Sequence, residues 1–242
     1  MPKIIFFGKS DVGLKRTNNE DDFVISSELG FCLAADGMGG AAAGELASRF
    51  FSETATEVFS GSDSRTGKET LDLVQKVFSF ANKRILDHVK ESAHHQGMGC
   101  TAELVAFSDE GFVLGHIGDS RTYRLRDGQL KQLTQDHSFV QEQIDQGLIR
   151  PDEARNHHLR NVILRAVGVN DNLALDLLRG KTYSGDLFLL CSDGLTDMVD
   201  DSLVHQVLSS AAPLPQKADA LVDSAKSAGG DDNITVVLSE VV

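Results

Sequence analysis

Short apolar runs with the length of β-strands alternate with polar stretches along the chain. The first three are "KIIFFG" (3–8), "DFVISS" (22–27) and "GFCLAAD" (30–36). Later runs are "TAELVAFS" (101–108), "GFVLGHIG" (111–118), "LALDLL" (173–178), "DLFLLCSD" (186–193) and "ITVVLSE" (234–240). We expect each run to form a strand, because short apolar segments bounded by turn residues are typical of strands.

One pair of strands is predicted by its turn. The stretch "RTYRLRDGQLKQLT" (121–134) alternates apolar and polar residues, and Asp127-Gly128 lies near its middle. An Asp-Gly pair between alternating segments is a strong signal for a β-hairpin.

Four regions have helical patterns. Residues 41–60 are rich in alanine and apolar residues, and residues 138–160 look helical and polar with a break at Pro151. Residues 201–228 hold two helical segments broken near Pro213 and Pro215. In residues 69–90 the apolar positions recur at helical spacing: Leu71, Val74, Val77, Phe78, Ala81, Ile85 and Val89. Few helices fall between successive strands, so the order favours an α+β fold of mainly antiparallel sheets with helices outside.

Composition narrows the class of protein. A chain of 242 residues is long enough for one large domain or two small ones, and no linker divides it. No apolar run approaches the roughly 20 residues that span a bilayer, and the N-terminus turns polar too soon for a signal peptide. We therefore expect a cytoplasmic protein with no membrane partner. The formal net charge of −13 makes nucleic-acid binding improbable, because phosphate backbones would be repelled.

The three cysteines do not suggest thiol chemistry. Cys32, Cys100 and Cys191 lack CxxC spacing, and an odd number argues against a disulfide framework. Cysteine-dependent phosphatases have arginine six residues after the cysteine, whereas this chain has Met38, Ala106 and Asp197 there, in chain order. We expect Cys32 and Cys191 to be buried core thiols.

Aspartates stand at the ends of the predicted strands. Asp36, Asp119 and Asp193 each follow an apolar run, and Asp232 precedes the last one. Because the end of one antiparallel strand lies beside the start of its neighbour, all four can share one rim. Clustered carboxylates repel each other unless cations compensate, and oxygen ligands suit Mg²⁺ or Mn²⁺. A single Asp-Gly would be an ordinary turn.

Other residues near these positions sharpen the metal hypothesis. Gly37 follows Asp36 and can turn its carbonyl toward a cation that Asp36 holds. Zinc is disfavoured, because no histidine or cysteine accompanies the aspartates. The pairs His94-His95 and His157-His158 are expected to be surface residues whose side chains diverge.

Six motifs, in order, give the chain a resemblance to the metal-dependent protein phosphatases of the protein phosphatase 2C type, bacterial members included. They are "VGLKRTNNEDDF", "AADGMGGAAAGELAS", "MGCTAELVAF", "GHIGDSRTYRLRDGQLKQLTQDHS", "LLCSDGLTD" and "GGDDNITVVL". The resemblance runs from about residue 8 to the end. It implies a four-layer αββα sandwich, in which two mainly antiparallel sheets are flanked by helix pairs. It also implies one catalytic domain over residues 1–242, with a mobile flap at about 138–168.

The resemblance further implies the activity: hydrolysis of phosphoserine or phosphothreonine in proteins, by direct attack of a hydroxide that bridges two Mn²⁺ or Mg²⁺ ions. By position, Asp36 would bridge both ions and Gly37 would give its carbonyl to one. Asp193 and Asp232 would complete the other shell, with Asp231 as a competing candidate for the place of Asp232. The remaining implied roles are a third metal site at Asp119 with Asp193, contacts through water for Glu20 and Asp21, and phosphate binding by Arg16.

The chain departs from the family at two positions. Met38 stands where some members have a histidine that can protonate the leaving group, and Ala41 stands where bacterial members usually have histidine. Methionine cannot donate a proton, so another group must. We expect Ala41 to have only a modest effect.

Two other functions remain open as alternatives. A non-catalytic phosphoprotein-binding relative would typically lack some of the metal aspartates, whereas this chain keeps them with Arg16. A phosphatase of the haloacid dehalogenase type needs Asp-x-Asp and a parallel sheet, and Asp36-Gly37-Met38 and Asp193-Gly194-Leu195 both break that motif. For the phosphatase we expect phosphorylated proteins as substrates, a cognate serine/threonine kinase as the opposing enzyme, and a monomer.

Overall fold

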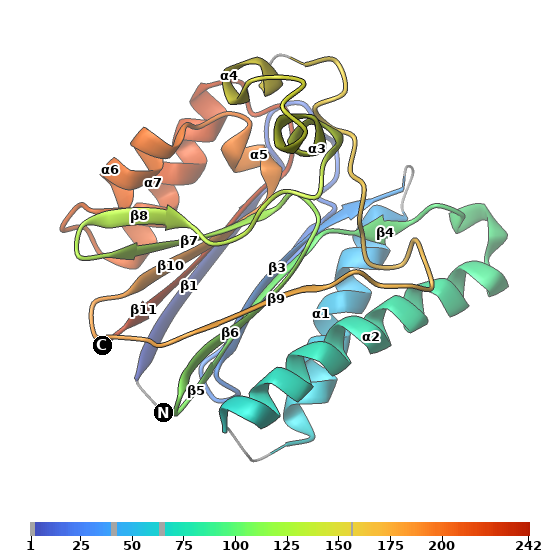
Figure 1. Ribbon diagram of the computed structural model, residues 1–242, viewed down its shortest axis with the longest axis horizontal. Coiled ribbons are helices and arrows are strands. Elements are labelled where there is room, and N and C mark those ends of the chain that lie inside the picture. The colour runs from blue at the N-terminus through green and yellow to red at the C-terminus, as the bar shows by residue number, and fades with distance from the viewer. Residues whose placement is uncertain (1–2, 40–42, 63–65, 156) are drawn as a thin grey trace.

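Two antiparallel β-sheets face each other, and helices cover their outer faces (Figure 1). The computed structural model describes residues 3–39, 43–62, 66–155 and 157–242. The first sheet has the order β1-β11-β10-β7-β8, with β1 Ile4–Asp11, β7 Arg121–Arg126, β8 Gln129–Gln132, β10 Leu187–Cys191 and β11 Ile234–Val241. The second has the order β2-β3-β5-β6-β9, with β4 paired to β3. Its strands are β2 Asp21–Ser26, β3 Phe31–Met38, β4 Gly99–Cys100, β5 Ala102–Ser108, β6 Gly111–Ile117 and β9 Asp176–Gly180.

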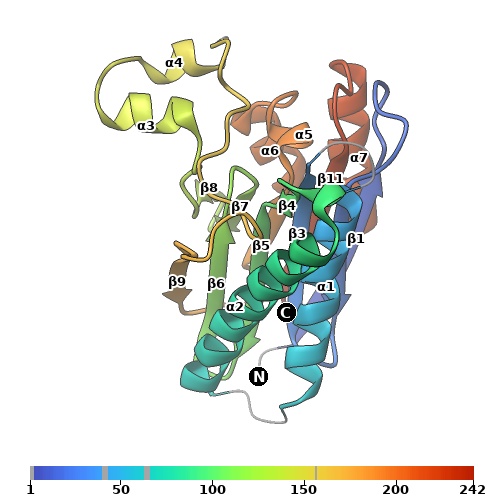
Figure 2. The same ribbon diagram turned by 90° about the vertical axis from the view of Figure 1, so that its right-hand side faces the viewer.

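The helices form two groups on opposite sides of the sheets, and a third group lies beyond the sheet ends. Helices α1 (Gly44–Ser60) and α2 (Gly67–Glu91) pack on the second sheet. Helices α5 (Asp193–Thr196), α6 (Asp201–Leu208) and α7 (Leu214–Ser227) pack on the first. Helices α3 (Phe139–Asp145) and α4 (Pro151–Ala154) project to one side of the sandwich (Figure 2). A short 3₁₀ helix covers Ala93–His95. The predicted α+β sandwich is confirmed.

The strand period of two residues explains the layers, because successive side chains point to opposite faces of a sheet. In β3, Phe31 and Leu33 pack toward α1 and α2, whereas Cys32 and Ala34 point between the sheets. In β10 the same alternation divides Leu189 from Leu190. Three apolar layers result, one between the sheets and one under each helix group. Strands buried on both faces therefore read as continuous apolar runs in the sequence.

Local signals place several boundaries. Helix α2 begins after Thr66, whose side chain accepts from the Glu69 backbone N–H while the Glu69 carboxylate accepts from the Thr66 N–H, a capping box. Helix α6 begins after Asp200, whose carboxylate accepts from the Leu203 N–H. The β7–β8 hairpin turns at Asp127 and Gly128, with φ of 51° and 72°. Both residues are left-handed, as a two-residue type I′ turn requires, so the predicted hairpin is confirmed.

Several element predictions were wrong in detail. Strand β3 continues to Met38 and does not stop at Asp36, because Gly37 and Met38 pair with β4. Within 138–160 the described residues, 138–155 and 157–160, form only the short helices α3 and α4 among irregular chain. Strand β9 begins at Asp176, three residues later than the apolar run. Neither β4 nor α5 was expected, since two to four residues are too few to produce a periodic pattern.

Other expectations concern surface and core residues. Cys32, Cys100 and Cys191 are free and buried, as expected for the first and last of them. Both histidine pairs lie at the surface, but the rings of His94 and His95 are 4.1 Å apart between centroids, so the expected divergence was wrong. In the part of the chain that the structure describes, no helix is long and apolar enough to cross a membrane. Every pairing between the described strands is antiparallel, which contradicts the parallel sheet of a dehalogenase-type phosphatase.

Candidate active site

Asp36 lies where the layer between the sheets opens at one end of the sandwich. Asp36 lies two residues beyond Ala34 and four beyond Cys32 in β3, so its side chain is on the same face of the sheet as theirs, which point between the sheets. Asp21 lies directly opposite Asp36 on the neighbouring strand β2. The two carboxylates are thus brought together by sheet register.

The other predicted aspartates converge on the same place from both sheets. Asp119 follows β6, Asp193 begins α5 directly after β10, and Asp232 precedes β11. Each of them, like Asp21, acts electrostatically on the Asp36 carboxylate. The structure therefore gathers the four predicted strand-end aspartates with Asp21. Asp232 is among the groups that act most strongly on Asp36 and Asp231 is exposed, which favours Asp232.

Burial and mutual repulsion raise the pKa values of these carboxyls. Burial raises the pKa of Asp21 to about 6 and that of Asp119 to about 7, and in each case a neighbouring aspartate adds to the rise. The pKa values of Asp36 and Asp193 lie well above the ordinary value for the same two reasons. Asp36 and Asp193 are half-buried, so part of each residue is accessible to solvent. Such a cluster is unstable in its ionised form without positive charge.

The donor set fits hard divalent cations. Asp21 Oδ1, Asp119 Oδ1 and Asp193 Oδ1 are buried and have no hydrogen-bond partner in the described part of the chain. Buried polar atoms are nearly always satisfied, so three orphaned carboxylate oxygens at one site indicate that cations belong there. As they stand, no three described His, Cys, Asp or Glu side chains converge closely enough to bind an ion. The carboxylates would have to draw together around one.

Arg16 lies at the rim of the cluster. Its Nη2 donates to Asp232 Oδ2 at 2.6 Å, and both side chains are partly exposed. The family resemblance implies that Arg16 binds the substrate phosphate and that Asp232 binds a metal ion. In the structure these two side chains form an ion pair with each other. Asn233 holds the surrounding loop: its Nδ2 donates to the carbonyls of Val12 and Asn18, and its Oδ1 accepts from the Glu20 N–H at 2.8 Å.

Gly37 is required by close packing. A Cβ at this position would lie 2.1 Å from the Gly44 carbonyl oxygen and 2.6 Å from that of Glu20. The Gly37 N–H donates to the Glu20 carbonyl at 3.1 Å, and Ser48 Oγ donates to the same oxygen at 2.6 Å. The backbone freedom that the sequence analysis invoked is not the reason for glycine, since Gly37 is not among the residues with positive φ.

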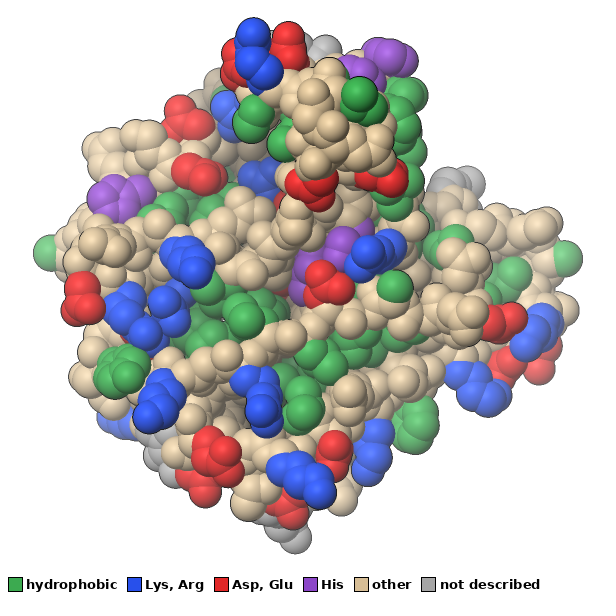
Figure 3. Space-filling model, in the orientation of Figure 1, with side chains coloured by type: hydrophobic (Ala, Val, Ile, Leu, Met, Phe, Trp, Pro, Cys, Tyr) green, Lys and Arg blue, Asp and Glu red, His purple; other side chains and the backbone are tan. Residues whose placement is uncertain are grey.

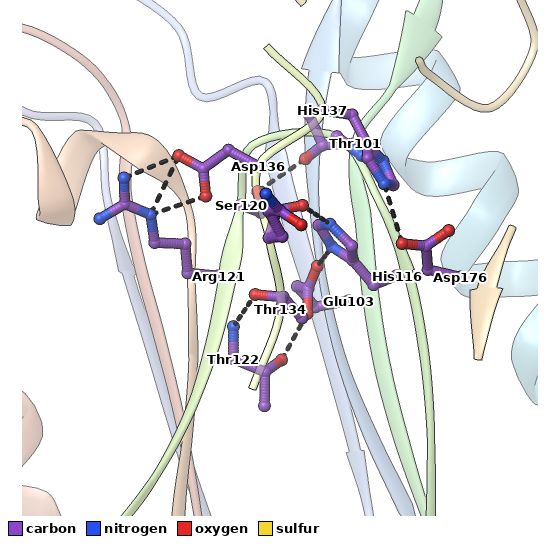
Figure 4. Close-up of polar contacts among 12 residues, drawn as sticks. Thr101, Glu103, His116, Ser120, Arg121, Thr122, Thr134, Asp136, His137 and Asp176 are labelled. Atoms are coloured by element: carbon purple, nitrogen blue, oxygen red, sulfur yellow. Dashed lines mark hydrogen bonds and ion pairs between the residues drawn. The ribbon is translucent and has the colours of Figure 1, made fainter. Parts of the chain in front are cut away.

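Thr101 and Ser120 were not assigned any role from the sequence, although both lie in the quoted motifs. Their hydroxyls are 2.7 Å apart (Figure 4). The Thr101 hydroxyl also accepts from the Asp36 N–H at 3.3 Å. The Thr101 N–H donates to the Asp36 carbonyl at 2.9 Å. Thr101 therefore links the strand that carries Asp36 to the turn that carries Asp119.

The segment 138–168 covers one side of the site. A cleft of about 370 Å³ lies between this segment and the main body, and its lining includes Asp119, Asp193 and Arg121. Arg155 Nη2 donates to the carbonyls of Thr196 and Val199, which ties the segment to α5 and the turn after it. Arg121 donates to Asp136 at 2.8 and 2.7 Å in the wall of the cleft (Figure 4).

The two departures from the family pattern have different outcomes. Met38 is half-buried, and its Cε lies near Gly99. It offers no proton donor at the site. Ala41 lies outside the described residues.

The molecule's excess negative charge is not spread as one patch over the face shown in Figure 3, where acidic and basic side chains are interspersed. The acidic residues at the site lie instead in the cleft and between the sheets. The net charge of −13 therefore has two sources, acidic side chains on the solvated surface and the carboxylate cluster at the site.

Comparison with known proteins agrees with this geometry. The sequence pattern of the family Protein phosphatase 2C matches residues 14–233. The chain is 38% identical over 237 residues to the serine/threonine protein phosphatase PstP of Mycobacterium tuberculosis, covering 98% of this chain and 45% of that protein. It thus spans about half the length of that relative. Serine/threonine phosphatase stp of Listeria innocua is 35% identical over 236 residues, covering 96% of this chain and 94% of that protein.

The fold is shared as well. A crystal structure of the catalytic domain of PstP in complex with two manganese ions superposes with a TM-score of 0.89, at 36% identity, covering 99% of this chain and 98% of that one. Sequence pattern, identity and fold agree over nearly the whole chain. The chain therefore belongs to the protein phosphatase 2C family of bacterial-type serine/threonine phosphatases.

Proposed function

We propose that this chain is a metal-dependent serine/threonine protein phosphatase that hydrolyses phosphoserine and phosphothreonine in proteins. The observation that carries the proposal is the gathering of Asp21, Asp36, Asp119, Asp193 and Asp232 at one end of the sandwich, with three orphaned carboxylate oxygens. The relative PstP binds two manganese ions on the same fold.

We assign the ion-binding residues as the resemblance to the family implies, and their gathering around Asp36 supports the assignment. Asp36 would be shared by two ions, the Gly37 carbonyl would contact one, and Asp193 with Asp232 would complete the other shell. Glu20 and Asp21 would act through water. Ser192 Oγ donates to Asp21 Oδ2 at 2.8 Å, which occupies one carboxylate oxygen and leaves Oδ1 free. Asp119, with Asp193, would hold a third ion.

Mn²⁺ and Mg²⁺ both suit an all-oxygen donor set. Bound ions would activate a water molecule as the nucleophile and neutralise charge on the phosphoryl group that is transferred. The negative charge of the cluster is the reason that the chain needs them.

Arg16 would bind the substrate phosphate. A guanidinium offers two parallel N–H donors that match phosphate oxygens. In the structure one of the guanidinium donors, Nη2, is directed to Asp232, so binding of phosphate by that donor requires that Arg16 exchange this partner. Its partial exposure, and the low net worth of exposed ion pairs, make that exchange easy.

Proton donation to the leaving serine or threonine oxygen cannot come from Met38, which has no exchangeable proton. A water molecule at the site is the simplest donor that remains, because the cleft is open to solvent and the side chain at this position is inert.

We further propose a biological setting. Phosphorylated proteins would be the substrates, a cognate serine/threonine kinase would supply them, and the segment 138–168 would act as a flap beside the site. The single catalytic domain over 1–242, the monomer and the cytoplasmic location stay predictions.

Release of inorganic phosphate from a phosphothreonine peptide tests the proposal. We expect release with Mn²⁺, none with EDTA, and restoration when Mn²⁺ is added back. Full activity in EDTA would contradict the metal mechanism. Tight binding of the peptide without hydrolysis, in the presence of Mn²⁺, would favour a phosphoprotein-binding module.

A further inference from the structure

His137 lies between the turn that carries Asp119 and the end of the segment 138–168. It follows β8 and is buried. Its backbone N–H donates to the Gly118 carbonyl at 2.7 Å, and its carbonyl accepts from the Leu164 N–H at 2.7 Å. The backbone of this one residue therefore contacts both structures.

The His137 side chain repeats the contact with Gly118 and adds one with Asp176. Its Nδ1 accepts from the Gly118 N–H at 3.1 Å, so the proton of the neutral ring is on Nε2. Nε2 then donates to Asp176 Oδ2 at 3.2 Å, at the start of β9. Arg165 Nη1 donates to the other oxygen of Asp176 at 3.2 Å, and its closeness to Nε2 is a contact between two donors.

The surroundings favour the neutral ring. The ring of His116 lies 4.5 Å away between centroids, and His116 contacts the Glu103 carboxylate through Nδ1 and the Gln135 carbonyl through Nε2 (Figure 4). With Glu103 ionised, both nitrogens of His116 face acceptors and His116 is an imidazolium, in line with its pKa, which Glu103 raises to about 9. Burial, with the positive charges of His116 and Arg165, lowers the pKa of His137 to about 4. A charged His137 would also turn its Nδ1 donor against the Gly118 N–H.

Position 118 requires glycine. Its φ is +114°, and a Cβ there would lie 2.4 Å from the Thr101 side chain. The turn is thus packed against Thr101 on one side and hydrogen-bonded to His137 on another. Asp119 is the next residue, so whatever fixes Gly118 also sets the direction of the Asp119 carboxylate.

We propose that His137 is a positioning residue that holds the Asp119 turn with Nδ1 and holds Asp176 with Nε2. Because Asp176 also accepts from Arg165, near the end of the 138–168 segment, the turn and the segment keep a fixed relation. The proposal rests on the role proposed above for Asp119 in the catalytic site. It requires no contact between His137 and substrate.

Two substitutions separate the two contacts. In His137→Asn the amide oxygen can take the place of Nδ1 and accept from Gly118, but nothing reaches Asp176. In His137→Gln the amide can reach toward Asp176, but no acceptor stands at the place of Nδ1. Asp176→Ala removes the second contact without changing the histidine. His158→Asn is the matched control, because it makes the same change at an exposed histidine within the same segment.

Two readouts need neither metal nor activity. Amide hydrogen exchange at Gly118 reports the first contact, because a lost hydrogen bond lets an amide open more often. Trypsin cleavage after Arg155 and Arg160 reports how firmly the segment is held. We expect His137→Gln to speed exchange at Gly118 about tenfold, while His137→Asn and Asp176→Ala leave it near wild type. We expect His137→Asn and Asp176→Ala to speed trypsin cleavage about fivefold.

Activity with Mn²⁺ gives a third readout. His137→Gln should lower kcat about tenfold with little change in KM, and His137→Asn should keep kcat within about threefold of wild type. Equal effects of His137→Asn and His137→Gln on amide exchange, trypsin cleavage and kcat would overturn the proposal and leave His137 a packing residue. If the chain is inactive, amide exchange at Gly118 and trypsin cleavage of the segment still test the proposal. If both His137 variants unfold, the same two measurements on Asp176→Ala test it.

Discussion

The hydroxyl of Thr101 lies 2.7 Å from the hydroxyl of Ser120, and both groups are buried. Thr101 contacts the backbone of Asp36 through its own N–H and through its hydroxyl. Ser120 directly follows Asp119. A single hydroxyl pair therefore joins the two backbone positions from which separate carboxylates of the cluster project.

Thr101→Val tests this link, because valine keeps the shape and removes the hydroxyl. We expect a loss of about 1–3 kcal/mol in the free energy of unfolding, since the buried Ser120 hydroxyl loses its partner. We expect kcat to fall as well, because the Asp36 and Asp119 positions are no longer tied. Urea unfolding and steady-state kinetics measure the two effects. Thr56→Val, at an exposed position of α1, should change neither by much; equal losses in both variants would argue against the link.

Arg16→Ala should weaken substrate binding far more than it weakens the fold. Removing charge-assisted hydrogen bonds to a phosphate is expected to lower kcat/KM about 10²-fold. The exposed pair with Asp232 contributes at most about 1 kcal/mol to the free energy of unfolding. Lys15→Ala, an exposed neighbour in the same loop, is the control. A normal kcat/KM in Arg16→Ala would remove Arg16 from the phosphate site.

Gly37→Ala should damage the site through a clash and not through backbone conformation. The added Cβ would meet the carbonyl oxygens of Gly44 and Glu20, so the start of α1 or the Glu20 loop must shift. We expect kcat to drop at least tenfold. Gly61→Ala has only ordinary contacts at 3.6 Å and should keep its stability within about 0.5 kcal/mol. Crystal structures or melting curves that show no change in Gly37→Ala would contradict the packing argument.

The buried pair of Glu103 and His116 predicts a pH dependence of stability. The Glu103 carboxylate raises the pKa of His116 to about 9, whereas burial raises the pKa of Glu103. We take the pair as charged, because both His116 nitrogens face acceptors. The folded-state pKa of His116 lies above the value of 6.5 for an unperturbed histidine, so its stabilisation is complete below pH 6.5 and is lost as the pH rises through about 9.

His116→Gln leaves Glu103 buried without its cation and should cost about 3–5 kcal/mol at pH 6. The difference from wild type should shrink as the pH is raised through 9. Glu103→Gln combined with His116→Gln should cost less than the sum of the single changes, because the two groups interact directly. Denaturant unfolding at several pH values measures this, and a difference that is constant from pH 6 to pH 10 would show that His116 is neutral in the fold.

Local patterns were sufficient for the main architecture. Apolar runs predicted the long strands, an alanine-rich apolar composition predicted α1, helical spacing predicted α2, and Asp127-Gly128 predicted the hairpin, because each of these signals is contained in neighbouring residues. Irregular chain was harder to predict. The 138–160 region has helical composition, but its backbone is fixed by contacts such as those of Arg155 with the main body. Tertiary contacts of this kind leave no periodic trace in a sequence.

The site shows the same division. The convergence of Asp36, Asp119, Asp193 and Asp232 could be predicted, since antiparallel register brings the ends of neighbouring strands together. The Arg16–Asp232 ion pair could not be predicted, because the two residues are 216 positions apart in the sequence. The side-chain contacts of His137 could not be predicted either, because Gly118 and Asp176 are 19 and 39 positions from it. The packing reason for Gly37 was equally hidden, since Gly44 and Glu20 approach it only in the folded chain.

Calorimetric titration of the metal-free chain with Mn²⁺, using wild type and Asp36→Asn, tests the central claim that the aspartate cluster is a two-ion site. Asp36 interacts with every other carboxylate of the cluster. The wild type should bind at least two ions per chain and release protons, because the raised pKa values leave part of the cluster protonated near neutral pH. Asp36→Asn should lose tight binding of both ions while remaining folded by circular dichroism. Binding of two ions by Asp36→Asn with wild-type affinity would contradict the account.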